Sequence, residues 1–181
     1  PASGDPFFLG FAAGKYFPPQ GEFIDPALSA AAARLGRDGR PSAETYAFVM
    51  FSKKITDARV AQLEALGARV LSFHPHYTMK VAVRADAIQG VAGQDFVRWI
   101  GTAQSWQKVH PMLTEEIARR TAGQRVDVWV NVFDSDVNAG SLAIPGPRAI
   151  EGAMDTITGE SSRDSSDTGV WITNGWQQRA L

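Results

Sequence analysis

The sequence contains no cysteine. This absence excludes disulfide bonds, zinc sites built on cysteine and catalytic thiols, but it identifies no compartment, because many secreted bacterial proteins also avoid cysteine. The chain also has no excess of charge of one sign, since it contains 18 basic and 19 acidic residues and its net charge is −1. Nucleic-acid-binding domains and polybasic membrane-binding segments carry basic patches, so we expect neither partner.

Long apolar runs are missing as well. A membrane-spanning helix needs about 20 apolar residues, and the run FFLGFAA at Phe7–Ala13 is far shorter. This run also lacks the basic flank and the small-residue cleavage pattern of a signal peptide. A chain that starts at Pro1 is expected to have lost either a signal peptide or an initiator methionine, and the sequence leaves both open.

What is present is a globular composition. The chain has 181 residues, of which 44% are hydrophobic and 20% are charged. This length and composition suffice for one ordinary domain or two small ones with an apolar core.

Residues 1–43 are rich in proline and in aromatic side chains. The Pro18-Pro19 pair breaks any helix, and Ala27–Leu35 has the composition of a short helix that ends at Gly36. We predict an extended arm with one short helix, which packs its aromatic residues across a neighbouring surface.

Residues 44–113 alternate between strand and helix patterns. The predicted order is a strand, a helix capped by Thr56, a hairpin, a second helix and a last strand: Thr45–Ser52, Thr56–Leu66, Ala68–Phe73 with Thr78–Arg84, Ala85–Val91 and Phe96–Thr102. This order predicts an α+β fold of the ferredoxin-like (βαββαβ) type, an antiparallel sandwich with two helices on one face. The other sheet face is predicted to be uncovered, which makes it a natural docking surface.

Residues 114–181 predict a second, partial α/β unit of similar type. An extended tail over Trp106–Leu113 leads to it, and its expected elements are a helix at Thr114–Arg120 with a capping-box-like start, strands at Arg125–Phe133 and Val170–Thr173, and one helix within Pro145–Thr158. The predicted domains are therefore 1–43, 44–113 and 114–181.

Few residues are candidates for metal binding, pH sensing or catalysis. His74 and His76 lie in the predicted hairpin turn, where exposed turn histidines are the favoured interpretation and pH sensing is the alternative. Asp134–Asn138 resembles the start of a calcium loop, but Ala139 and Pro145 break the EF-hand pattern. Glu115 and Glu116 are interpreted as residues of a solvated helix. No metal ligands and no cofactor are predicted.

The run from Thr45 to Leu113 resembles the N-terminal prodomain region of bacterial subtilisin-like serine peptidases. The resemblance is carried by QLEALGARV at Gln62–Val70, KVAVRA at Lys80–Ala85, VRWIG at Val97–Gly101 and the dipeptide His110-Pro111. It implies a ferredoxin-like propeptide that packs its sheet on the peptidase, assists its folding as an intramolecular chaperone, and inhibits it until processing.

The resemblance also implies a site and a partner. Its tail in the substrate cleft would consist of Trp106, Lys108, Val109, His110, Pro111, Met112 and Leu113. This chain departs from the pattern because it continues into another strand, so the segment can equally be a linker. The catalytic triad of a peptidase is not in the chain, since Asp167-Thr168-Gly169 follows a serine-rich loop and has no His or Ser motif beside it.

The leading hypothesis is a non-enzymatic module of a secreted or cell-envelope bacterial protein, with a subtilisin-like peptidase as its partner in cis or in trans. The alternative is a stand-alone interaction or structural module, or a trans-acting protease inhibitor, that is not attached to a peptidase.

Overall fold

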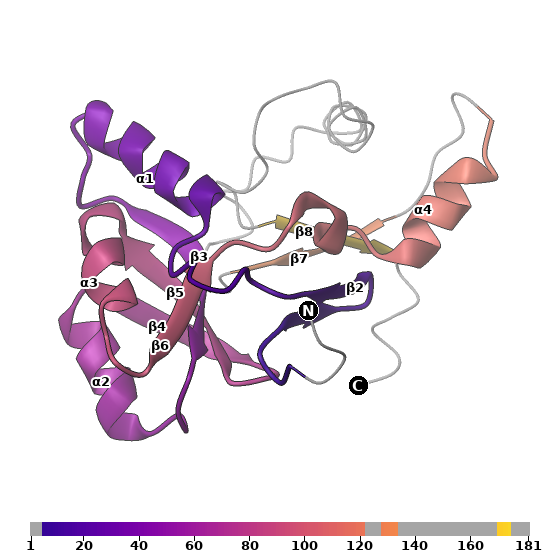
Figure 1. The fold of residues 1–181 in the computed structure, drawn as a ribbon. Coiled ribbons are helices and arrows are strands. Elements are labelled where there is room, and N and C mark those ends of the chain that lie inside the picture. Colours follow the sequence, from indigo (N-terminus) through magenta and orange to yellow (C-terminus); the bar gives the residue numbers. More distant parts are fainter. Residues whose placement is uncertain (1–4, 122–127, 134–169, 175–181) are drawn as a thin grey trace.

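The computed structural model describes residues 5–121, 128–133 and 170–174. Its centre is a four-stranded sheet in the order β4-β5-β3-β6, in which every neighbouring pair is antiparallel. The strands are β3 (Glu44–Phe51), β4 (Ala68–His74), β5 (Thr78–Arg84) and β6 (Val97–Gly101). The prediction of an α+β fold with antiparallel strands is therefore confirmed (Figure 1).

One face of the sheet is covered by helices (Figure 1). These are α1 (Pro26–Arg37), α2 (Asp57–Ala65), the 3-10 turn η1 (Ala85–Ala87) and α3 (Ile88–Ala92). Ala47, Val49 and Phe51, which alternate along β3, share one buried cluster with Leu28 of α1 and Leu63 of α2. The layer thus contains a third helix beyond the two predicted, because the helix of the N-terminal arm joins it.

The ends of α2 follow the local chemistry that the sequence predicts. The Thr56 hydroxyl accepts a hydrogen bond from the Arg59 backbone N–H at 3.4 Å, as an N-cap residue does. Gly67 follows the helix with φ of 101°, a left-handed conformation that favours glycine.

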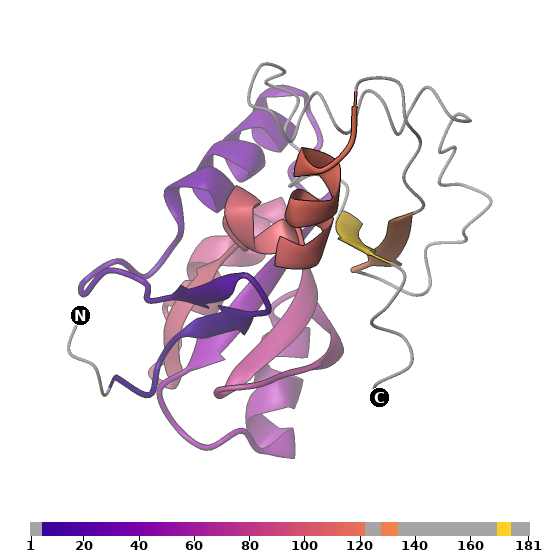
Figure 2. The ribbon, with the colours of Figure 1, turned by 90° about the vertical axis from the view of Figure 1, so that its right-hand side faces the viewer.

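The opposite face of the sheet is not open. The N-terminal arm folds into a hairpin of β1 (Leu9–Phe11) and β2 (Gly14–Tyr16), which lies across this face (Figures 1 and 2). Leu9, Phe48, Met50 and Trp99 are buried together there. The prediction of an uncovered face is wrong, because the aromatic arm packs on the sheet of its own chain.

Strand β4 does not alternate regularly between the two faces of the sheet. Its pairing with β5 shifts between Val70 and Ser72, so Leu71 is the extra residue of a β-bulge. Val70 packs against the helical layer, whereas Leu71 packs on the opposite face. Beyond the bulge the faces change, and Phe73 is 61% exposed.

The segment after β6 is not extended, contrary to the prediction. Ser105–Lys108 forms the 3-10 turn η2, and Pro111–Ala118 forms α4. Gln104 and Gln107 form a reciprocal capping box around η2. α4 begins earlier than the predicted helix, because Pro111 occupies its first turn and the His110 ring accepts a hydrogen bond from the Met112 backbone N–H.

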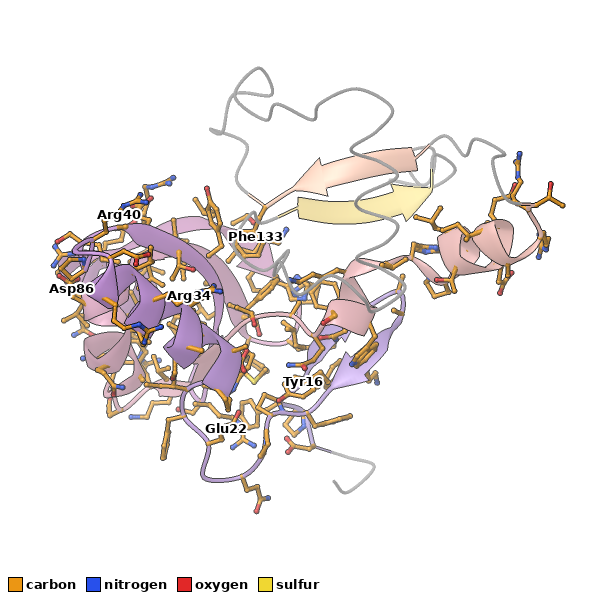
Figure 3. The ribbon with its side chains drawn as sticks, turned by 90° about the horizontal axis from the view of Figure 1, so that it is seen from above. Tyr16, Glu22, Arg34, Arg40, Asp86 and Phe133 are labelled. Carbon is orange, nitrogen blue, oxygen red and sulfur yellow. The ribbon has the colours of Figure 1, made fainter. Side chains whose placement is uncertain are left out.

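A two-stranded antiparallel sheet of β7 (Val128–Val132) and β8 (Val170–Asn174) contains the two strands predicted for the C-terminal part. Phe133, just after β7, points back to the main sheet and packs against Tyr46 and Phe48 (Figure 3). The predicted helix within Pro145–Thr158, the calcium candidate Asp134–Asn138 and the Asp167 motif lie outside the described residues. Within the described part of the chain, no helix has the length and apolarity to cross a bilayer.

Candidate functional site

His74 lies under the N-terminal hairpin. It is only 8% exposed, and its Nε2 is hydrogen-bonded to the Gly10 carbonyl oxygen at 3.1 Å. Its ring also packs against the rings of Phe11 and Phe48, each at 5.0 Å. Burial, and then the charge of Lys80, lower the pKa of His74 from 6.5 to about 4. The interpretation of His74 as an exposed turn residue is therefore wrong.

His76 is exposed, as predicted, but it also contacts the arm. Its ring lies 3.8 Å from the ring of Phe8, measured between centroids. The turn that holds it is tight, because His76 and Tyr77 have φ angles of 63° and 58°. The structure thus brings both predicted histidines against the N-terminal arm, His74 at Gly10 and Phe11 of β1 and His76 at Phe8 just before it.

The arm is also hydrogen-bonded to a side chain of η2. The Gln107 side chain is buried, and its Nε2 donates to the carbonyl oxygens of Leu9 at 3.0 Å and Gly14 at 3.4 Å. The Trp106 ring lies against Gly14, where an added Cβ would be 3.1 Å from the ring. Sequence reasoning did not single out Gln107, and its only local signal is the spacing Gln104–Gln107 of the capping box.

Asp25 holds the other end of the arm. Its Oδ2 accepts hydrogen bonds from the Thr102 N–H at 2.9 Å and the Thr102 hydroxyl at 2.7 Å, while Oδ1 accepts from the Ala27 N–H at 3.0 Å. The same buried carboxylate therefore caps α1 and joins it to the end of β6. Ile24 also forms a parallel bridge with Ile100, which covers the outer edge of β6.

The predicted tail residues separate into three groups by exposure. Trp106 is 49% exposed and Met112 is 46% exposed, whereas Leu113 is buried. Lys108, Val109, His110 and Pro111 are half-buried between η2 and the start of α4. The segment therefore presents two large apolar side chains, one on the η2 turn and one on α4, rather than on a free extended strand.

A cavity of about 300 Å³ lies where the Pro18–Phe23 loop meets β6. Three buried polar atoms of its lining residues have no hydrogen-bond partner among the described residues: Glu22 Oε1, Arg98 Nε and Trp99 Nε1. Tyr16 packs 6.0 Å from Trp99, and burial, then the charges of Glu22 and Asp25, raise its pKa (Figure 3). Within the described ranges no three His, Asp or Glu side chains gather as a metal site would require.

Comparison with known proteins identifies a family. Residues 12–104 match the family described as "Domain of unknown function (DUF8729)". Neither the curated proteins nor the solved structures contain a match to this chain. The matched region runs from the hairpin turn through α1 and the whole four-stranded sheet, and it includes both Asp25 and its partner Thr102. The chain therefore belongs to the DUF8729 family.

Proposed function

We propose that this chain is a non-catalytic, prodomain-like module that binds a bacterial subtilisin-like serine peptidase outside the cytoplasm. In this role it assists the folding of the peptidase and inhibits it until processing. The observation that carries the proposal is the segment directly after β6, where Trp106 of η2, a turn that Gln107 anchors, and Met112 of α4 present large apolar side chains.

A ferredoxin-like architecture is part of this proposal. In residues 44–101 the first strand is β3, and the strand order β4-β5-β3-β6 places it between the third and the fourth strand. This arrangement, with α2 and α3 as the two connecting helices on one face, supports the ferredoxin-like βαββαβ description.

The binding surface differs from the one that the resemblance implies. The hairpin β1–β2 covers the sheet face opposite the helices, so this face is closed in the free chain. The η2–α4 segment then offers the most accessible apolar anchors near the predicted tail. Aromatic residues that become buried at the centre of an interface contribute most of its binding energy.

The alternative is a stand-alone interaction module without an attached peptidase. The closed sheet supports it, because a module whose two faces are both covered needs no partner to bury its core. The two hypotheses differ in whether a subtilisin-like peptidase recognises the η2–α4 surface.

Calorimetry tests the proposal by measuring whether the chain binds a purified bacterial subtilisin-like peptidase that is inactivated at its catalytic serine. Inhibition of the active peptidase by the chain is the second readout. The double variant Trp106→Ala/Met112→Ala is expected to weaken binding about tenfold or more. Phe73→Ala is the matched control, since it removes an even more exposed apolar side chain near the β4–β5 turn and is expected to leave binding unchanged.

Two results would reject the proposal. One is the absence of binding by the folded wild-type chain, which would favour the stand-alone module. The other is equal weakening by the Phe73 control, which would indicate non-specific apolar association. Truncation after Thr102 is a poorer test, because it also removes Gln107, which holds the arm.

A further inference from the structure

The arm is attached to the sheet by a small number of polar contacts. Within the described residues, side chains from two places donate to or accept from the backbone of β1–β2: His74 at Gly10, and Gln107 at Leu9 and Gly14. The strands of this hairpin have three residues each. A hairpin this short is not stable alone in water, so it depends on the surface beneath it.

The surroundings of His74 are hostile to a positive charge. The charged or titratable groups that face it are Lys80 from β5 and His76 from the turn, and both disfavour its protonation. The Gly10 carbonyl of the arm accepts a hydrogen bond from the His74 ring and by itself favours the charged form, but burial and the charge of Lys80 outweigh it, since the pKa of His74 is lowered overall. The rings of Phe11 and Phe48 enclose His74 on the sides of the arm and of β3. Lys15 of β2 lies over the Phe8 ring, next to His76, and adds a further positive charge on this side.

We propose that the β1–β2 hairpin is a strap over the far face of the sheet, and that protonation of His74 releases it. A charged imidazole between Phe11 and Phe48 loses its hydration, and it faces Lys80 without a carboxylate among the groups that act on it. Movement of the arm away from the turn returns the ring to water. The proposal is independent of the partner's identity.

The difference in the pKa of His74 between the closed and the released arm determines how strongly pH shifts the arm between these two states. The pKa of His74 is about 4 under the arm and 6.5 when the ring is in water. Acidification therefore favours the released state, because that state binds the proton more tightly. From pH 7 to pH 5 the ratio of released to closed arm rises at most about 20-fold, and it stops rising below the lower pKa.

Release would uncover an apolar face. Phe48 and Met50 of β3 and Trp99 of β6 are completely or almost completely buried in the cluster that contains Leu9 of the arm, and Phe133 also packs on Phe48. Opening of the strap in acid would therefore bring apolar side chains of the sheet into contact with water.

Hydrogen exchange tests the strap, because it detects rare openings and can be corrected for the intrinsic pH dependence of exchange. Protection factors of the β1 and β2 amides are measured at pH 7 and pH 5, with the β3 amides as a reference for global unfolding. In the wild type we expect the arm amides to be less protected than those of β3, and to lose about 20-fold in protection at pH 5.

Two substitutions sharpen the test. His74→Gln keeps a donor for the Gly10 carbonyl but cannot titrate, and it should abolish most of the pH response. His110→Gln is the matched control, since His110 is the only other histidine besides the turn pair and should leave the response intact. His74→Phe, which retains an aromatic ring between Phe11 and Phe48, serves if the glutamine variant does not fold.

Three outcomes would overturn the proposal. The first is equal protection of arm and β3 amides, which means that the arm opens only when the whole module unfolds. The second is an unchanged protection factor of the wild-type arm at pH 5. The third is a full pH response in the folded His74 variants.

Discussion

Gly101→Ala should be among the most damaging small substitutions in this module. A Cβ at Gly101 would lie 2.1 Å from Cζ2 of Trp99 and 2.5 Å from the Cβ of Asp25. Neither neighbour can move freely, because Trp99 is completely buried and Asp25 accepts hydrogen bonds from Thr102 and from the first turn of α1. The Cβ therefore displaces both the ring and the residue that carries the carboxylate.

The expected cost follows from these two contacts. Overpacking a well-packed core costs about 1–3 kcal/mol, and loss of a helix N-cap costs about 1 kcal/mol. Disturbing the hydrogen bonds from Thr102 to the carboxylate adds about 1–2 kcal/mol. We expect a loss of roughly 3–6 kcal/mol, which is a large part of the 5–15 kcal/mol by which a typical domain is stable.

Urea unfolding followed by circular dichroism measures this loss. Gly36→Ala in α1 is the matched control, because nothing lies within 4 Å of the position where its Cβ would be. This control should gain up to about 0.5–1 kcal/mol from improved helix propensity. If Gly101→Ala stays within about 1 kcal/mol of the wild type, the close packing of Trp99 and Asp25 around this glycine is refuted.

Two further predictions concern buried polar groups. Asp25→Ala should lower the free energy of unfolding by about 2–4 kcal/mol, since it removes the α1 cap and leaves the Thr102 donors unpaired. Asp25→Asn should lower it less. Equal losses for the two variants in urea titrations would contradict this prediction. The second concerns His74, whose pKa is lowered on folding from 6.5 to about 4. Above pH 6.5 His74 is neutral in the folded and the unfolded chain and does not change the free energy of unfolding. As the pH falls from 6.5 to 4, the unfolded chain binds the proton more tightly, and the free energy of unfolding falls by up to about 3 kcal/mol. Unfolding curves between pH 7 and 4 should show this slope in the wild type and a smaller one in His74→Gln.

The sheet and its helices were predictable because their signals are local. β5 coincides with the predicted strand Thr78–Arg84, and β3 differs from the predicted strand by one residue at each end. The cap at Thr56 and the glycine at Gly67 define the ends of α2 through their own side-chain and backbone chemistry. Such features need no knowledge of the rest of the chain.

The contacts of the candidate site were not predictable in the same way. Strands of three residues, as in β1 and β2, carry too little periodicity to be distinguished from a loop. The burial of His74 depends on the arm that lies over it, so no pattern around the turn reveals it. The same holds for Gln107, whose partners Leu9 and Gly14 are far away in the sequence.

One local signal did contradict an open sheet face. β3 is apolar on both sides, with Val49 and Phe51 toward the helices and Phe48 and Met50 toward the arm. A strand of this kind requires a cover on each face, and the arm supplies the second one. Complete burial of Phe48, Met50 and Trp99 contributes about 6 kcal/mol at roughly 2 kcal/mol for each side chain. Any partner that docks on this face must therefore offer a comparable apolar area to displace the arm. In the proposed mechanism, protonation of His74 lowers the free energy that such a partner must provide for this displacement.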